Sequence, residues 1–459
     1  MSIHENSDVR VPINIDSVSI TRDDSKCVLC GSCRSVCKFI QGVYGRYDLE
    51  KTNDKAICIE CGQCSNVCPT NAICEVKDYI KVKEYIKNDN YVVIFQTAPA
   101  VRVSLGEEFG FEVGEFVQGK LVSALKKLGA SYVFDTAYGA DLTIMEEANE
   151  LIERIQNNGV LPMFTSCCPA WVKFLEMFYP KYIPNLSTVK SPILMEGAIV
   201  KTYFASKMNI APEKIIHVAV TPCTAKKYEI KREEMKDSGE FLNKEIQDVD
   251  FVITVRELAK WIREENIDFK SLEEEDYDSL LGEASGAGVI FGATGGVMEA
   301  ALRTAHFYIT GKRLENIEFE SVRGLDGIKE ANVSVGEYDL SIAVINGTNN
   351  THKFFDMLKN GDKHYDFIEV MACLGGCVAG GGQPKVAQTE NHLEKEKRAA
   401  SLYKKDKILK RCSYENDEIQ LLYKEFLKEP GSEVSKKLLH TTYNSKEHML
   451  NIKKEDILV

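Results

Sequence analysis

Short apolar runs alternate with amphipathic segments along most of the chain after Tyr91. The runs have the length of buried strands, whereas the longer segments repeat apolar positions at helical spacing. Strands are expected at 91–96, 131–135, 160–165, 214–220, 250–255, 340–347 and 367–373, and helices at 120–129, 142–156, 256–265 and 349–361. These elements form two successive series, 91–165 and 214–373, so the pattern predicts two α/β lobes.

The two ends of the chain differ in sequence pattern from this α/β part. Before about Asn90 the sequence is broken into short segments around cysteines, which predicts a compact module held together by a cofactor. From about Leu393 it is rich in Lys and Glu, with helical periodicity over 418–429. This last part is expected to wrap around the outside of the molecule.

The first cysteines form two copies of one spacing pattern, C-x2-C-x2-C-x3-C, typical of two-cluster bacterial ferredoxins. In such a run three thiolates reach one cluster and the fourth crosses to the other cluster. The expected ligand sets are therefore Cys27, Cys30, Cys33 and Cys68 for one 4Fe4S cluster, and Cys37, Cys58, Cys61 and Cys64 for the second. Structural zinc is the alternative, but it favours CxxC pairs with a longer gap between them.

Five further cysteines follow predicted strands of the α/β part, where ligands commonly bind. They are Cys167, Cys168, Cys223, Cys373 and Cys377. Four thiolates from three loops could close a third cubane; the alternative is a set of buried core cysteines. Because adjacent cysteines are poorly placed to share one cluster, either Cys167 or Cys168 is left over as a thiol that could carry protons. Cys74 and Cys412 fit no spacing pattern and are interpreted as incidental thiols.

Composition narrows the class of protein. The 459 residues carry a net charge of −12, which argues against nucleic acid as a partner. The N-terminus lacks a signal-peptide pattern, and no window is apolar enough for a membrane span. We therefore expect a cytoplasmic protein with no membrane partner, in which the 15 cysteines are metal ligands or catalysts rather than disulfides.

Three segments together resemble the signature segments of FeFe (iron-only) hydrogenases: TSCCPAW at 165–171, TPCTAKKYE at 221–229 and EVMACLGGCVAGGGQP at 369–384. The resemblance, with the cysteine module, covers Lys26 to Pro384. It implies a two-lobed α/β catalytic domain of mixed sheets flanked by helices, preceded by an α+β two-cluster ferredoxin-like domain. The expected boundaries are an arm at 1–22, the ferredoxin-like domain at 23–88, the catalytic domain at 89–392 and a small-subunit-like extension at 393–459.

The resemblance also implies a cofactor, the H-cluster, in which a 4Fe4S cube is joined through one cysteine to a di-iron unit carrying CO, cyanide and an azadithiolate. Cys168, Cys223, Cys373 and Cys377 match its ligands, with Cys377 as the bridge. Lys226 matches a lysine that donates a hydrogen bond to a cyanide. The residues that match the surrounding pocket are Ala98, Pro99, Ser166, Thr221, Pro222, Ile193, Phe291 and Met371. The glycine run at 285–300 resembles one wall of this pocket; read as a nucleotide loop it lacks the G-x-G-x-x-G spacing.

Glu147, Glu150 and Arg154 share one face of the predicted helix 142–156. Taken alone, they would be interpreted as a solvated charged face. The resemblance implies that they form, together with Cys167 and Ser187, the proton path between solvent and the dithiolate amine.

Three positions depart from the common family pattern, which has Met, Gln and Gly where this chain has Thr221, Ile193 and Ala170. Groups around a metal centre tune its potential and access, so these changes are expected to affect catalytic bias and inhibitor response. In particular, the Thr221 hydroxyl is expected to face a roomier and wetter di-iron pocket.

The predicted function is therefore reversible reduction of protons to dihydrogen, with a ferredoxin-type electron partner and with maturation proteins that load the cofactor. Two alternatives remain: an iron-sulfur scaffold protein without the di-iron unit, and a hydrogen sensor.

Overall fold

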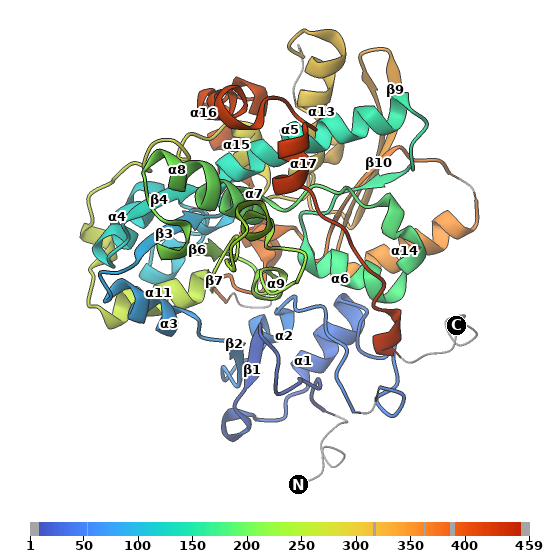
Figure 1. Cartoon of the computed structure of the whole chain (residues 1–459). Helices are drawn as coiled ribbons and strands as arrows, with labels where there is room; N and C mark the ends of the chain where they lie inside the picture. Colours follow the sequence, from blue (N-terminus) through green and yellow to red (C-terminus); the bar gives the residue numbers. More distant parts are fainter. Residues whose placement is uncertain (1–8, 53, 315–317, 362, 386–390, 451–459) are drawn as a thin grey trace.

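The computed structural model describes residues 9–52, 54–314, 318–361, 363–385 and 391–450, so the first eight and last nine residues of the predicted arm and extension lie outside the described residues. Figure 1 shows a small N-terminal region, drawn in blue, beneath two α/β lobes. The predicted fold class is confirmed. Within the described ranges no helix combines the length and apolarity needed to cross a membrane.

The N-terminal region is built around two short, similar helices. A β-ribbon, β1 (Ile20–Arg22) paired with β2 (Ile73–Glu75), flanks α1 (Ser32–Ser35) and α2 (Gln63–Asn66). Each helix follows a left-handed glycine inside a cysteine run, Gly31 with φ 75° and Gly62 with φ 70°. Helix α3 (Tyr79–Ile86) then leads into the first lobe.

Each lobe contains a four-stranded sheet. The first has the order β4 (Tyr132–Asp135), β3 (Val92–Thr97), β6 (Ile215–Thr221), β7 (Phe251–Thr254), all parallel. The second has the order β5 (Met163–Phe164), β10 (Phe367–Met371), β9 (Tyr338–Asn346), β8 (Ile328–Val335), with β8 antiparallel. The two sequence series therefore exchange strands, because β5 joins the second sheet whereas β6 and β7 join the first.

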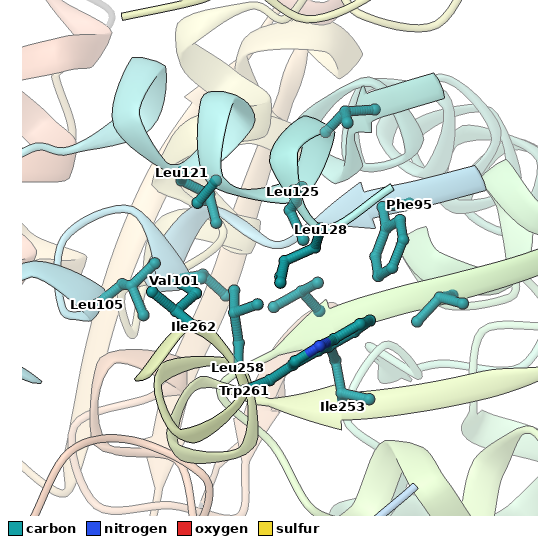
Figure 2. Close-up of a cluster of buried hydrophobic side chains, with 14 of the residues drawn as sticks. Phe95, Val101, Leu105, Leu121, Leu125, Leu128, Ile253, Leu258, Trp261 and Ile262 are labelled. Atoms are coloured by element: carbon teal, nitrogen blue, oxygen red, sulfur yellow. The ribbon is translucent and has the colours of Figure 1, made fainter. Parts of the chain in front are cut away.

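One face of the first sheet is covered by α4 (Gln118–Lys127) and α11 (Val255–Glu264) (Figure 2). Phe95 and Ile253 project from the strands onto Leu121, Leu125 and Trp261 of the helices. The strands are apolar on both faces, as expected for a parallel sheet with helices on either side. A capping box between Thr254 and Glu257 begins α11 directly after β7.

Helix α5 (Thr136–Gln156) lies between the lobes and packs against both. Its Leu142 and Met145 belong to the core of the first lobe, and its Ile144 and Leu151 to the core of the second. It begins before the predicted residue 142, because Asp135 at the end of β4 caps it by accepting from the Ala137 N–H at 2.8 Å. The helix thereby carries the charged face of Glu147, Glu150 and Arg154 along the boundary between the lobes.

The remaining long helices of the catalytic region are α6 (Pro169–Phe178), α7 (Pro192–Ile199), α13 (Gly296–Thr310) and α14 (Thr348–Lys359), and the shorter ones are α8 (Ala205–Lys207), α9 (Ala225–Glu229), α10 (Asp237–Leu242) and α12 (Gly286–Ile290). The glycine run at 285–300 forms α12 and the start of α13. A side chain at Gly288 would meet the Ala137 carbonyl of α5, so glycine there permits close helix packing rather than a phosphate loop.

The C-terminal segment covers the outer surface, as predicted. It contains α15 (Asn391–Asp406), α16 (Asp417–Leu422) and α17 (Glu433–Leu439). The helix expected over 418–429 is α16 continued by a π-helical turn, Tyr423–Leu427. After α17 the backbone runs beside residues 188–190, with the Thr441 N–H donating to the Thr188 carbonyl at 2.7 Å.

Arg256 of α11 joins the N-terminal region to the catalytic lobes. Its guanidinium donates to both oxygens of Glu75 at 3.0 Å, to Asn66 at 2.6 Å and to the Gly381 carbonyl at 2.6 Å. Glu75 is buried, and although burial opposes it, Arg256 holds the pKa of this carboxyl below its usual value. The small domain is therefore anchored at a buried ion pair.

Arg256→Ala is expected to destabilise the protein by about 3–5 kcal/mol, because it leaves the Glu75 carboxylate buried without its partner. The urea unfolding midpoint of the cluster-loaded protein measures this. Arg263→Ala on the same helix is the matched control: Arg263 pairs with Glu108 at the surface, where such a pair is worth about 1 kcal/mol or less. Equal effects of the two changes would contradict the anchoring role.

Candidate functional site: three groups of thiols and a proton path

The N-terminal cysteines surround two separate cavities. One is lined by Cys27, Cys30, Cys33 and Cys68. The other is lined by Cys37, Cys58, Cys61 and Cys64. These are the crossed sets expected from the spacing, in which the last cysteine of each run lies with the other run.

Among the described residues, no three His, Cys, Asp or Glu side chains come close enough together to hold one metal ion. Backbone N–H groups nevertheless point at the sulfurs: Val11 at Cys33 at 3.4 Å, Glu60 at Cys58 at 3.2 Å and Ile73 at Cys68 at 3.4 Å. Such donors stabilise thiolate ligands.

A third group of thiols lies where the two sheets meet. Cys168 follows β5, Cys223 follows β6, and Cys373 follows β10, so strand ends of both sheets contribute. Burial raises the pKa of all four thiols in this group, and Cys377 is near enough to the other three for their charges to raise its pKa further. As free thiolates they would be unstable together, whereas iron would supply the missing positive charge.

The second N-terminal group lies next to this third group. Gln63, between the cysteines of the second run, donates its amide to Cys373 Sγ at 3.2 Å and to the Ala379 carbonyl at 2.8 Å. Two glycines allow the close approach: a side chain at Gly62 would meet Thr224, and one at Gly381 would meet the Cys61 carbonyl. The two groups of thiols are thus in contact through a short, rigid connection.

Lys226 of α9 lies beside the third group. Its ammonium donates to Glu229 at 2.8 Å and to the Cys167 carbonyl at 3.0 Å. Burial lowers its pKa, but the Glu229 carboxylate outweighs this, so the pKa is raised and the lysine stays charged. An ammonium has three donors, and among the described residues these two oxygens are the acceptors that the Lys226 ammonium reaches. This fits a ligand such as cyanide.

Thr221 has a more local role than expected. Its hydroxyl donates to the Cys223 carbonyl at 2.9 Å and accepts from the Cys223 N–H at 3.3 Å. The side chain therefore shapes the turn that presents Cys223 instead of offering a free hydroxyl to the pocket. Ile193 packs with Ala219 and Val252, in a cluster that contains no cysteine.

The other expected pocket residues lie around Cys377 and Cys167. Phe291 and Met371 pack in the same cluster as these two cysteines. Ala98 and Pro99 follow β3, and the Ala98 N–H donates to the Val220 carbonyl at 2.9 Å, beside the Cys223 turn. The Ser166 hydroxyl is directed away, to the Val189 carbonyl at 2.6 Å, and the Pro222 carbonyl accepts from the Gly382 N–H at 2.7 Å.

The outer part of the expected proton path is connected by hydrogen bonds. Glu150 accepts from the Ser187 hydroxyl at 2.9 Å and from Arg154 at 2.6 Å. The Thr188 N–H and hydroxyl also donate to it, at 3.0 and 3.2 Å. Arg154 is in turn held by the Leu186 carbonyl at 2.7 Å. The helix face that could have been solvated is instead packed against residues 184–188.

The inner part of the path contains an unpaired carboxyl. Both oxygens of Glu147 are buried, and neither has a hydrogen-bond partner among the described residues. Burial, aided by repulsion from Glu150, raises the pKa of Glu147 to about 8. Cys167 lies close enough for Glu147 to raise its pKa, which burial already raises well above the usual value. Both groups thus hold their protons at neutral pH.

Sequence reasoning missed several residues that the structure brings to the site. Gln63 lies inside the second cysteine run, and Glu229 lies three residues after Lys226 in the segment TPCTAKKYE. Both residues therefore belong to motifs that the sequence identifies. Thr188 and His440 gave no such signal, because His440 reaches the path from the far end of the chain.

Three family models match the chain: the iron only hydrogenase large subunit, C-terminal domain, at residues 91–381; the iron hydrogenase small subunit at 392–446; and a 4Fe-4S dicluster domain at 11–73. Iron hydrogenase 1 of Clostridium pasteurianum is 46% identical over 443 residues, in a match that covers 93% of this chain and 76% of that protein. The cytosolic Fe-S cluster assembly factor narfl of Danio rerio is 31% identical over 78% of this chain and 88% of that protein.

Solved structures agree with these matches. The apo FeFe-hydrogenase HydA1 from Chlamydomonas reinhardtii superposes with a TM-score of 0.71 and 39% identity, over 81% of this chain and 99% of that one. The chain therefore belongs to the iron-only (FeFe) hydrogenase family.

Proposed function

We propose that this hydrogenase reduces protons to dihydrogen, reversibly, with electrons that enter through two N-terminal 4Fe4S clusters from a ferredoxin-type partner. The observation that carries the proposal is the third group of thiols. The four thiols of this group converge beside a cluster-binding domain on one side and the Cys167–Glu147 pair on the other. Electrons and protons thus have separate approaches to one point.

The ligand assignment follows from the three groups. Cys27, Cys30, Cys33 and Cys68 would hold the first cluster, Cys37, Cys58, Cys61 and Cys64 the second, and Cys168, Cys223, Cys373 and Cys377 the cube of the H-cluster. When bound, the di-iron unit supplies the redox chemistry that joins protons and electrons. Lys226 would donate to one of its cyanides, and Phe291 and Met371 would keep water from it. We also propose maturation proteins as partners that load the di-iron unit; the solved structure of one relative, 38% identical to this chain, reveals stepwise assembly of its H-cluster.

The protons are delivered by side chains of this chain. We assign the order Arg154, Glu150, Ser187, Glu147, Cys167, from the surface inwards. Arg154 and Ser187 hold Glu150 in place, whereas Glu147, with no fixed partner, carries the proton over the step to the Cys167 thiol. Each transfer requires hydrogen-bond reach at the moment it occurs.

The electron partner would dock at the first cluster. Cys30 is exposed, and the neighbouring Val28, Leu29, Phe39 and Ile40 are exposed apolar side chains. Exposed apolar patches of this kind mark protein interaction sites. The domain boundaries 23–88, 89–392 and 393–459 are retained in this proposal, and a reducing, cytoplasmic compartment suits 15 cysteines that are all free thiols.

Infrared spectroscopy of the matured protein, combined with a hydrogen-evolution assay using reduced ferredoxin, tests the function. CO and cyanide stretches together with turnover are expected. A protein that binds iron at all three groups of thiols but shows neither signal would be a scaffold. One that shows the bands but turns over only slowly, and with a signalling partner, would be a sensor.

Cys167→Ala is expected to lower hydrogen evolution about 100-fold or more while all clusters assemble, because a methyl group cannot relay a proton. Glu147→Gln should behave in the same way. Turnover is measured alongside iron content and the di-iron infrared bands. Cys74→Ala, a cysteine outside the three groups, is the control. Near-parental turnover in a fully loaded Cys167→Ala protein would show that the relay is wrong.

The pH profile should report Glu147. Because its pKa is raised to about 8, the carboxyl is protonated and able to donate below that pH and loses its proton above it. Hydrogen evolution is therefore expected to fall as the pH rises through about 8. Glu147→Asp, which keeps a carboxyl, should retain a pH-dependent step, and Glu147→Gln should abolish it. An identical profile in the Gln variant would contradict this assignment.

A further inference from the structure

A second line of side chains reaches Glu150 from outside the proton path. The Thr188 hydroxyl donates to Glu150 Oε2 at 3.2 Å and lies 2.7 Å from His440 Nδ1. On the other side of the ring, His440 Nε2 lies 3.1 Å from Glu146 Oε2. His440 directly follows α17, within the segment that matches the small-subunit family model.

One arrangement of protons satisfies every contact on this line. The Thr188 hydroxyl donates to Glu150, and His440 Nδ1 donates to the Thr188 oxygen. The Glu146 carboxylate accepts from His440 Nε2 and is held in place by the Tyr423 hydroxyl at 2.6 Å and the Gly431 N–H at 2.8 Å. With a donor on both ring nitrogens, this arrangement contains an imidazolium.

The backbone holds the line together. The Lys190 N–H donates to the Leu439 carbonyl at 2.9 Å, and the Thr441 N–H donates to the Thr188 carbonyl at 2.7 Å. These bonds lie on both sides of the contact between Thr188 and His440, so the separation of the two side chains is fixed. The His440 side chain is 12% exposed, which gives it access to solvent protons.

Charged groups lie on several sides of this line. The Glu146 carboxylate contacts the His440 ring, and Glu150, which contacts Thr188, is paired with Arg154. The Lys190 ammonium donates to the Leu438 carbonyl at the end of α17 and is itself paired with Asp237 and Asp248. The other titratable groups nearby are Tyr308 and Tyr423 beside Glu146, and Glu153 and Lys436 beside Gly431.

We propose that His440 is a second proton entry to the site, which joins the path at Glu150 and therefore rests on the function proposed above. The imidazolium gives its Nδ1 proton to Thr188 Oγ1 while the Thr188 hydroxyl proton moves to Glu150 Oε2. One proton leaves the ring and one arrives at the carboxylate, so the balance is complete. The neutral ring keeps its Nε2–H on Glu146 and regains a proton from water.

The C-terminal extension thus has a chemical role in addition to covering the surface. It supplies an imidazole near Glu150, where the other described donors are Arg154, Ser187 and Thr188. Glu150 becomes a junction, with Arg154 on one branch and His440 on the other.

His440→Gln is expected to lower hydrogen evolution about threefold or more, since a positioned acid contributes at least this much to a proton-transfer step. The pH profile of hydrogen evolution should also change, because the imidazole adds to the path a titrating group that glutamine lacks. His440→Ala should be rescued by added imidazole, which fits the exposed site. A merely structural role would show no rescue. The control is His364→Gln, a surface histidine also beside a carboxylate, Asp366, at 3.2 Å.

Variants of Thr188 test the line without altering the ring. Thr188→Val should reproduce the changed pH profile, and Thr188→Ser, which keeps the hydroxyl, should restore it. Nitrogen NMR of histidine-labelled full-length protein gives a measure independent of turnover: Glu150→Gln should shift the titration of His440. If this shift occurs in a protein that shows no hydrogenase activity, the proposed function is wrong. The hydrogen-bonded line from His440 through Thr188 to Glu150 would still be supported. Unchanged rates, unchanged pH profiles or no shift would overturn the second entry.

Discussion

Burying four thiols at one point is the constraint on which the arrangement of the two lobes depends. Thiolates lose their hydration in a low-dielectric interior, and their mutual repulsion adds to that loss. The pKa of each cysteine in the third group is raised for these reasons. Such a group is stable in its ligand form only with iron bound. Because the strands that lead to it come from both sheets, both lobes must be in place before iron can be held.

The N-terminal domain also gathers cysteines that need iron to be stable together. It has few apolar residues to bury, and its two cysteine groups take the place of a larger core. Its contact with the catalytic lobes depends on specific polar interactions. Arg256 neutralises the buried Glu75, and Gln63 donates a hydrogen bond to Cys373 of the third group. Glycines at 62 and 381 remove the side chains that would separate the two regions. Under the proposed function, structural attachment and electron supply would therefore depend on the same few contacts.

Local signals explain what could be predicted from the sequence. Periodicity correctly predicted the strands at 91–96 and 214–220 and the helix at 256–265, because the apolar positions of these segments are also the buried ones. The cysteine spacing likewise predicted which cysteines of the two runs lie together. Which sheet a strand joins was not predictable, because periodicity specifies a buried strand and not its neighbour. The start of α13 was hidden by glycines that serve packing. His440 escaped notice because its partners, Thr188 and Glu146, lie hundreds of residues earlier.

The two carboxyls on the α5 face have opposite environments. Glu150 accepts hydrogen bonds from Ser187, Arg154 and Thr188, so its position is fixed by its neighbours. Glu147 accepts no hydrogen bond from the described residues, and because its pKa is raised to about 8 it holds a proton at neutral pH. In the proposed path Glu150 would therefore pass a proton inwards, and Glu147 would hold that proton beside the Cys167 thiol.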